Sequence, residues 1–201
     1  MKDKFQSAGV IPVLIFEKDE YAVPTARALI AGGLDVLEVT LRTEAAWAAL
    51  EAILTECPEA TVGVGTVLDH EQMRRAKDLG ASFAVSPGFH PFLVSTAQEL
   101  DLFYMPGVAT PSEVMQASSM GLSSLKFFPA EAAGGTAMLK SFISPFGAID
   151  FCPTGGISTQ NADEYRALKN VFCIGGSWVA TGDDMAKGDW DAITQKAKQV
   201  N

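Results

Sequence analysis

The stretch IDFCPTGGISTQNADEYRALKNVFCIGGSW, residues 149–178, contains two short apolar runs, each followed by a pair of glycines. Apart from Asp150, the runs 149–153 and 171–174 are apolar at consecutive positions, as expected of strands buried on both faces. A helical pattern at 161–169 lies between them, which predicts two parallel strands joined by a helix. Glycines after the last two strands favour an α/β barrel, because an open dinucleotide-binding sheet carries GxGxxG after its first strand and this chain has none there.

The same alternation of short apolar runs and longer amphipathic runs extends along the whole chain. Strands are predicted at 10–16, 36–40, 61–66, 83–86, 102–105, 124–127, 149–153 and 171–174. Eight units in 201 residues leave roughly 25 residues each, the lower size limit of a TIM-type barrel. We predict an α/β fold: a single (β/α)8 TIM barrel domain over residues 1–201, with the active site at the C-terminal face of the strands. A doubly wound open sheet is the alternative.

Composition and charge exclude several classes of partner. A net charge of −9 argues against nucleic acid and anionic membranes, because both require a basic surface. Cys57, Cys152 and Cys173 are far apart and form no CxxC, so neither a disulfide framework nor a zinc site is expected, and a cytoplasmic location fits best. His70 and His90 have no ligand-spaced partner, so we predict no metal.

A glutamate lies inside a predicted strand. Glu38 is the second residue of LEVTLRT, residues 37–43, and Arg42 follows the strand. Burying a lone carboxylate costs several kcal/mol, so Glu38 is expected to be paired or functional. The alternative to a catalytic role is a structural ion pair between Glu38 and Arg42.

A lysine also lies inside a predicted strand. Lys126 follows Leu125 and precedes Phe127 and Phe128, whereas most other lysines occur in polar or helical contexts. A lysine amine attacks a carbonyl only when unprotonated, which is rare at the ordinary lysine pKa of about 10.4. An apolar wall and a nearby cation such as Arg42 both favour the neutral amine. The alternative is a lysine that reaches from a strand end to water.

Glycine-rich loops follow the seventh and eighth predicted strands. They are PTGGIS, residues 153–158, and IGGSW, residues 174–178. Glycines let backbone N–H groups approach an anion closely, so the two loops predict a phosphate site, whereas tight turns alone are the alternative. Thr66 and Pro87 follow the third and fourth strands and are expected at the same mouth.

Together these motifs resemble the 2-keto-3-deoxy-6-phosphogluconate (KDPG) aldolases of the Entner–Doudoroff pathway, many of which also act on 2-keto-4-hydroxyglutarate (KHG). The resemblance runs essentially end to end. It rests on LEVTLRT at 37–43, GTVL at 65–68, SPG at 86–88, KFFPAEAAGG at 126–135, CPTGGIS at 152–158 and CIGGSW at 173–178.

The resemblance implies an aldehyde-lyase without a cofactor. It would cleave KDPG reversibly to pyruvate and D-glyceraldehyde 3-phosphate, and 4-hydroxy-2-oxoglutarate to pyruvate and glyoxylate. The implied roles are Lys126 as Schiff-base lysine, Glu38 as general acid/base, Arg42 and Thr66 on the carboxylate, Pro87, Phe128 and Thr154 around the pocket, and Gly155, Gly156, Gly176 and Ser177 on the phosphate.

The resemblance further implies a small-molecule substrate as partner and a homotrimer. The alternatives are an aldolase for the galactonate epimer, a sugar-phosphate isomerase and a non-catalytic sugar-phosphate binding protein. The sequence departs from the family pattern in two places. The leader before the first strand is short, which predicts a reduced helix at the barrel bottom, and Phe89–His90 follows SPG in a family-variable loop.

Overall fold

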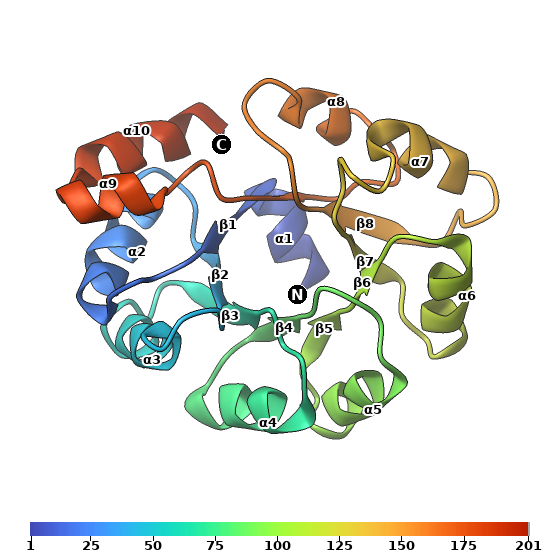
Figure 1. The fold of residues 1–201 in the computed structure, drawn as a ribbon, viewed down its shortest axis with the longest axis horizontal. Helices are drawn as coiled ribbons and strands as arrows, with labels where there is room; N and C mark the ends of the chain where they lie inside the picture. Colours follow the sequence, from blue (N-terminus) through green and yellow to red (C-terminus); the bar gives the residue numbers. More distant parts are fainter. Residues whose placement is uncertain (201) are drawn as a thin grey trace.

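The computed structural model describes residues 1–200, which form two parallel sheets surrounded by helices (Figure 1). Six strands form a curled sheet in the order β5-β4-β3-β2-β1-β9, and three form a second sheet in the order β6-β7-β8. The strands are β1 Val10–Leu14, β2 Val36–Thr40, β3 Thr61–Gly65, β4 Phe83–Val85, β5 Phe103–Met105, β6 Gly107–Val108, β7 Ser124–Phe127, β8 Asp150–Pro153 and β9 Ile174–Gly176.

The α/β class is confirmed, but the strand ladder differs from the prediction of one closed eight-stranded sheet. The predicted strand at 102–105 is followed by a separate short strand, β6, because Pro106 lies between them and has no N–H to donate to a ladder. The last strand is residues 174–176, not 171–174. Between β8 and the β9 region, two isolated parallel bridges occur, Phe151 to Val171 and Thr154 to Gly175.

Helices alternate with the strands and lie outside them. They are α2 Ala22–Ala31, α3 Ala46–Glu56, α4 His70–Leu79, α5 Pro91–Glu99, α6 Pro111–Ser119, α7 Gly135–Phe142, α8 Ala162–Arg166, α9 Gly182–Lys187 and α10 Trp190–Val200, with a 3₁₀ turn at Asp19–Tyr21. Local chemistry sets several starts: the Asp69 carboxylate accepts from the N–H of Gln72, and Thr110 and Glu113 form a capping box.

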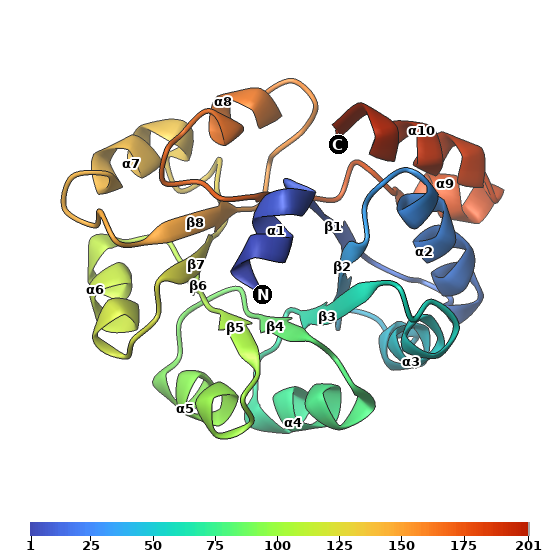
Figure 2. The ribbon, with the colours of Figure 1, turned by 180° about the vertical axis from the view of Figure 1, so that it is seen from behind.

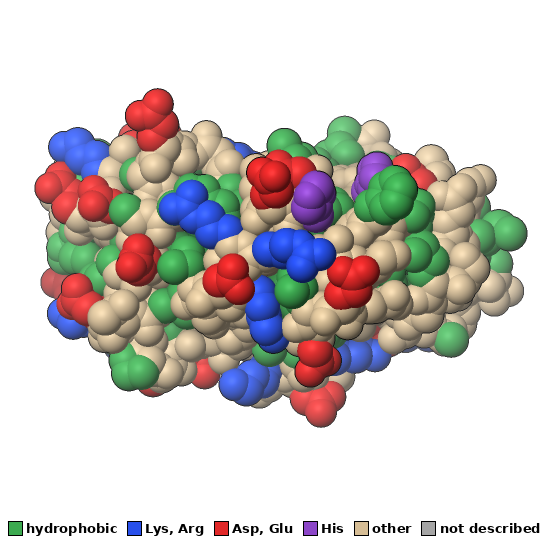
Figure 3. Space-filling model, turned by 90° about the horizontal axis from the view of Figure 1, so that it is seen from below, with side chains coloured by type: hydrophobic (Ala, Val, Ile, Leu, Met, Phe, Trp, Pro, Cys, Tyr) green, Lys and Arg blue, Asp and Glu red, His purple; other side chains and the backbone are tan. Residues whose placement is uncertain are grey.

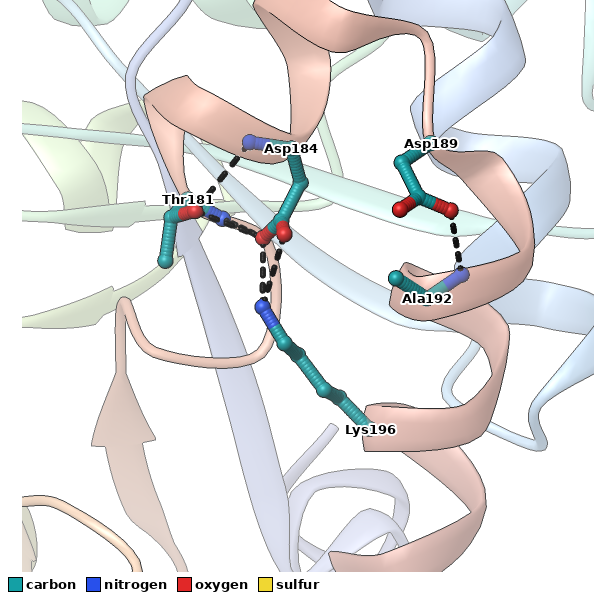
Figure 4. Close-up of polar contacts among 5 residues, drawn as sticks. All are labelled: Thr181, Asp184, Asp189, Ala192 and Lys196. Atoms are coloured by element: carbon teal, nitrogen blue, oxygen red, sulfur yellow. Dashed lines mark hydrogen bonds and ion pairs between the residues drawn. The ribbon is translucent and has the colours of Figure 1, made fainter.

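A polar cluster joins the last two helices (Figure 4). Thr181 and Asp184 form a capping box at the start of α9, and Lys196 of α10 donates to both Asp184 oxygens at 2.8 and 2.6 Å. Burial alone would raise the pKa of Asp184, but the hydrogen bonds from Lys196 and Thr181 lower it overall. Asp189 caps α10 by accepting from the N–H of Ala192 at 3.1 Å. These contacts anchor the chain that follows β9.

A short helix, α1 (Lys2–Ala8), covers the centre of the strands at the end where β1 begins (Figure 2). Its Phe5 side chain is fully buried, with ring centroids 4.8 Å from Phe83, 5.6 Å from Phe103 and 6.3 Å from Phe172. The residues before the first strand therefore form a helix of seven residues that closes this end. Because α1 covers this end, an active site can form only at the opposite end, where the strands have their C-terminal residues.

Candidate active site

Lys126 and Glu38 meet inside the molecule from different sheets. Glu38 lies on β2 and Lys126 on β7, and the lysine Nζ is 3.3 Å from the glutamate Oε1. The side chains are 3% and 4% exposed for Lys126 and Glu38, respectively. Lys126 therefore does not reach out to water, and Glu38 is not paired with Arg42, so both structural alternatives are wrong. A buried pair of this kind costs desolvation energy and contributes little net stability, which points to a functional reason for it.

Gly65 makes room for the Glu38 carboxylate. A Cβ atom added at Gly65 would lie 1.8 Å from Glu38 Oε1. Gly65 is the last residue of β3, which pairs with β2 in parallel register. This role of Gly65 is not visible in the sequence, because the contact appears only when the two strands are paired.

Arg42 and Thr66 meet at the ends of β2 and β3. The Arg42 Nε donates to Thr66 Oγ1 at 2.8 Å. Thr66 has a φ of 62°, in the left-handed region that a β-branched residue rarely occupies. Backbone strain of this kind is typical of functional sites. Here the strained residue, Thr66, is also the one whose hydroxyl accepts the hydrogen bond from Arg42.

The Pro87 loop lies against the strand next to Lys126. Gly107 is in register with Lys126, and a Cβ atom at Gly107 would lie 2.2 Å from the Pro87 carbonyl oxygen. Ser86 Oγ donates to the Gly88 carbonyl at 2.6 Å and lies 2.6 Å from Tyr104 Oη. Tyr104 and Gly107 thus support this loop, and sequence reasoning missed both because neither belongs to a recognisable motif.

The two glycine-rich loops lie side by side. A Cβ atom at Gly175 would lie 2.3 Å from Thr154 Oγ1, which is buried and has no hydrogen-bond partner among the described residues. Gly155 and Gly156 have φ values of 102° and 78°, as a turn requires. A Cβ atom at Gly176 would lie 1.9 Å from the Trp178 ring. Close approach is therefore a second reason for glycine, which the turn-only alternative does not explain.

The remaining predicted residues fall near this region or outside it. Phe128 contacts the lysine: the Lys126 Nζ lies 5.3 Å from the centroid of its ring. Ser177 is exposed directly after β9. His90 lines a different groove of about 430 Å³ together with His70 and Phe92, and no predicted site residue lines it. His90 of the variable Phe89–His90 loop therefore belongs to this groove and not to the region around Lys126.

Residues 1–200 form neither a metal-binding cluster nor a membrane-spanning helix. No group of three or more His, Cys, Asp and Glu side chains there is arranged to hold a metal ion. None of the helices in that range is both long enough and apolar enough to cross a membrane.

Comparison with known proteins decides the family. The family model "KDPG and KHG aldolase" matches residues 1–196. The chain belongs to the KDPG and KHG aldolase family. It is 50% identical over 191 residues to the KHG/KDPG aldolase of Escherichia coli strain K12, covering 95% of this chain and 90% of that protein.

Solved structures of this aldolase family have the same fold. The KDPG aldolase of Legionella pneumophila, with pyruvate captured as a covalent carbinolamine, superposes with a TM-score of 0.97 at 42% identity, covering 100% of this chain and 97% of that one. The aldolase of Zymomonas mobilis ZM4, with 3-phosphoglycerate, gives 0.91 at 44% identity, covering 98% and 93%.

Proposed function

We propose that this aldolase cleaves KDPG to pyruvate and D-glyceraldehyde 3-phosphate through a Schiff base on Lys126. The observation that carries the proposal is the buried Lys126–Glu38 pair, 3.3 Å apart. A proton moved from the lysine to the glutamate leaves a neutral amine in an apolar surrounding, and a neutral amine is the nucleophile that the reaction requires.

The proposed reaction begins when Lys126 attacks the C2 ketone of the substrate. Glu38 moves protons so that the carbinolamine loses water, and the iminium then accepts the electron pair of the C3–C4 bond. Glu38 removes the C4 hydroxyl proton as this bond breaks and glyceraldehyde 3-phosphate leaves. The remaining enamine is protonated and hydrolysed to pyruvate. General acid/base catalysis of this kind contributes roughly 10² to 10⁴ in rate.

The substrate is proposed to lie across the mouth from Arg42 to the glycine-rich loops. Arg42 and Thr66 would hold the carboxylate, because a guanidinium already oriented by a hydrogen bond at 2.8 Å is a good carboxylate partner. Pro87, Phe128 and Thr154 would shape the pocket. The phosphate would be bound by Gly155, Gly156, Gly176 and Ser177.

We further propose that the two sheets together form a complete (β/α)8 barrel in one domain, with the site at the C-terminal face. The support is the pair of bridges between the β8 and β9 regions and the position of α1 at the opposite end. Cytoplasmic location and the absence of a cofactor stay predictions.

A homotrimer is proposed as the assembly, with a second copy of the chain as the partner. Phe92 and Leu68 are 76% and 64% exposed and line the groove beside α4 and α5. Figure 3 shows this face, where two histidines and apolar side chains lie together. If this surface is the contact, Phe92→Asp will convert the assembly to monomers in light scattering, whereas an unchanged trimer would exclude the surface.

Borohydride trapping tests the reaction. Reduction in the presence of pyruvate should add a pyruvate-derived mass to the peptide that contains Lys126. Lys126→Ala should abolish the adduct and turnover, whereas Lys140→Ala, at an exposed position, should retain both. A sugar-phosphate isomerase or a non-catalytic binding protein would give no adduct. Comparative kinetics on KDPG, its galactonate epimer and KHG then identifies the preferred substrate.

A further inference from the structure

Glu131 and Tyr165 are hydrogen-bonded to each other beside the Gly155–Gly156 loop. Glu131 is an exposed residue that follows β7, and Tyr165 is a fully buried residue of α8 whose hydroxyl donates to Glu131 Oε1. Neither residue has a role in the reaction proposed above. Glu131, however, contacts Gly155 and Gly156, the loop proposed to bind the phosphate.

Glu131 contacts this loop with its backbone and with the stem of its side chain. Its N–H donates to the carbonyl of Gly155 at 3.1 Å. A Cβ atom at Gly156 would lie 2.6 Å from Glu131 Cγ and 2.7 Å from its Cβ, so the stem packs against the Gly156 backbone. Gly156 therefore cannot move toward Glu131 without displacing that side chain.

The carboxylate itself is held on the other side. A Cβ atom at Gly135, the first residue of α7, would lie 3.3 Å from Tyr165 Oη and 3.4 Å from Glu131 Oε1. Burial raises the pKa of Tyr165, and so does its hydrogen bond to Glu131, so the hydroxyl stays a donor at neutral pH. The hydrogen bond thus keeps Oε1 beside Tyr165 and the α7 start, while the apolar stem faces the loop.

The far end of the loop is held by a second side chain. Asn161 Oδ1 accepts from the N–H of Ser158 at 2.8 Å, and its Nδ2 donates to the Gly156 carbonyl at 3.2 Å. With Asn161 on one side and Glu131 on the other, the loop is fixed from both ends. This leaves its conformation dependent on two side chains outside the glycine motif.

We propose that Glu131, held by Tyr165, is a positioning residue that fixes the Gly155–Gly156 loop for the phosphate end of the substrate. The inference rests on the proposed function, in which this loop binds phosphate. A free carboxylate near the loop would repel an anion, and the Tyr165 hydrogen bond prevents this by holding the charge away from it. Tyr165→Phe frees the carboxylate, and Glu131→Ala removes the stem that packs against Gly156. Each should therefore weaken binding of a phosphorylated substrate and leave binding of pyruvate, which has no phosphate, unchanged.

The test compares KDPG with pyruvate in four variants. Tyr165→Phe removes the hydroxyl, Glu131→Ala removes stem and acceptor, and Glu131→Gln keeps both as the conservative variant. Thr194→Val is the matched control, because it removes a part-buried hydroxyl that donates to the carbonyls of Ala28 and Trp190, between α10 and α2 and outside the proposed site. The readouts are the KM for KDPG cleavage and the pyruvate concentration that gives half-maximal borohydride trapping.

The expected result is a KM for KDPG raised about three- to tenfold in Tyr165→Phe and Glu131→Ala, the effect of one lost hydrogen bond, with half-maximal trapping by pyruvate unchanged. Glu131→Gln should keep the KM within about twofold of wild type, and Thr194→Val should leave both constants at their wild-type values.

The two ways of failing are distinguishable. If the wild-type protein forms no pyruvate adduct, the proposed function fails and the inference fails with it. If the adduct forms, but Tyr165→Phe and Glu131→Ala leave both constants unchanged or raise them equally, only the positioning role is overturned. Urea titration shows whether Tyr165→Phe and Glu131→Ala are folded. If one of them is not, the KM for KDPG and the half-maximal pyruvate concentration of the other variant decide the outcome.

Discussion

The Nζ atom of Lys126 and the Oε1 atom of Glu38 lie 3.3 Å apart, although the two residues are 88 positions apart in the chain. They come from β7 and β2, which belong to different sheets. The pair is therefore made by the curvature that brings the two sheets face to face around a common interior. Its chemistry can be tested by changes at the pair and at the residues that shape it.

Glu38→Gln should lower kcat by roughly 10² to 10⁴, because the amide keeps the shape of the side chain and cannot exchange protons. Steady-state cleavage of KDPG measures this. Glu56→Gln is the matched control, since it breaks only the exposed pair with Arg27 and should leave kcat unchanged. A Glu38→Gln enzyme within threefold of wild type would remove Glu38 from the mechanism.

Gly65→Ala should lower kcat by about 100-fold with the fold retained, because the new methyl group would displace Glu38 Oε1, which lies 1.8 Å from its position. The control is Gly147→Ala, whose added Cβ atom meets only the Ile143 carbonyl oxygen, at 3.8 Å. Kinetics and urea unfolding distinguish the two. Wild-type kcat in Gly65→Ala would show that the carboxylate position is not critical.

Thr66→Ala should raise the pyruvate concentration for half-maximal trapping by about tenfold, because Arg42 loses the hydroxyl that orients its guanidinium at 2.8 Å. Thr66→Ser keeps an Oγ atom and should stay within about twofold of wild type. Both substitutions remove the β-branch from a position with a φ of 62°, so the comparison isolates the hydroxyl. Equal behaviour of the two variants would contradict the assignment.

Tyr104 should make the protein sensitive to alkaline pH. Burial raises the pKa of Tyr104 to about 12 from 10.0, although its hydrogen bond to Ser86 opposes the shift. The unfolded chain therefore loses this proton first, so the stability is fully present below pH 10 and is lost as the pH rises toward 12.

Urea unfolding below pH 10 and between pH 10 and 12 measures this effect. Over the upper window, wild type should lose on the order of 1 kcal/mol per pH unit more than Tyr104→Phe. Tyr165 titrates in both proteins and cancels in the difference. The same pH dependence in both would mean that Tyr104 ionises normally in the folded state.

Much of the fold could be predicted because strands buried on both faces are written as continuous apolar runs. The bounds of β2 and β7 are those predicted, and the lysine and the glutamate stand out because each interrupts such a run. The last strand shows the limit of this signal. Phe172 and Cys173 are apolar and buried in the same cluster as Phe5 of α1. Apolar character indicates burial and not ladder pairing, so the strand begins only at Ile174.

The sequence by itself determined the α/β class, the order of the units and the residue types of the site, because these depend on local patterns and short motifs. Only the tertiary structure decided the partners. Glu38 has Arg42 nearby in the chain but pairs with Lys126, Gly65 is required by a carboxylate on the neighbouring strand, and Tyr165 of α8 holds Glu131 of the turn after β7. Partners are set by which strands and helices pack together, and that information is spread over the whole chain.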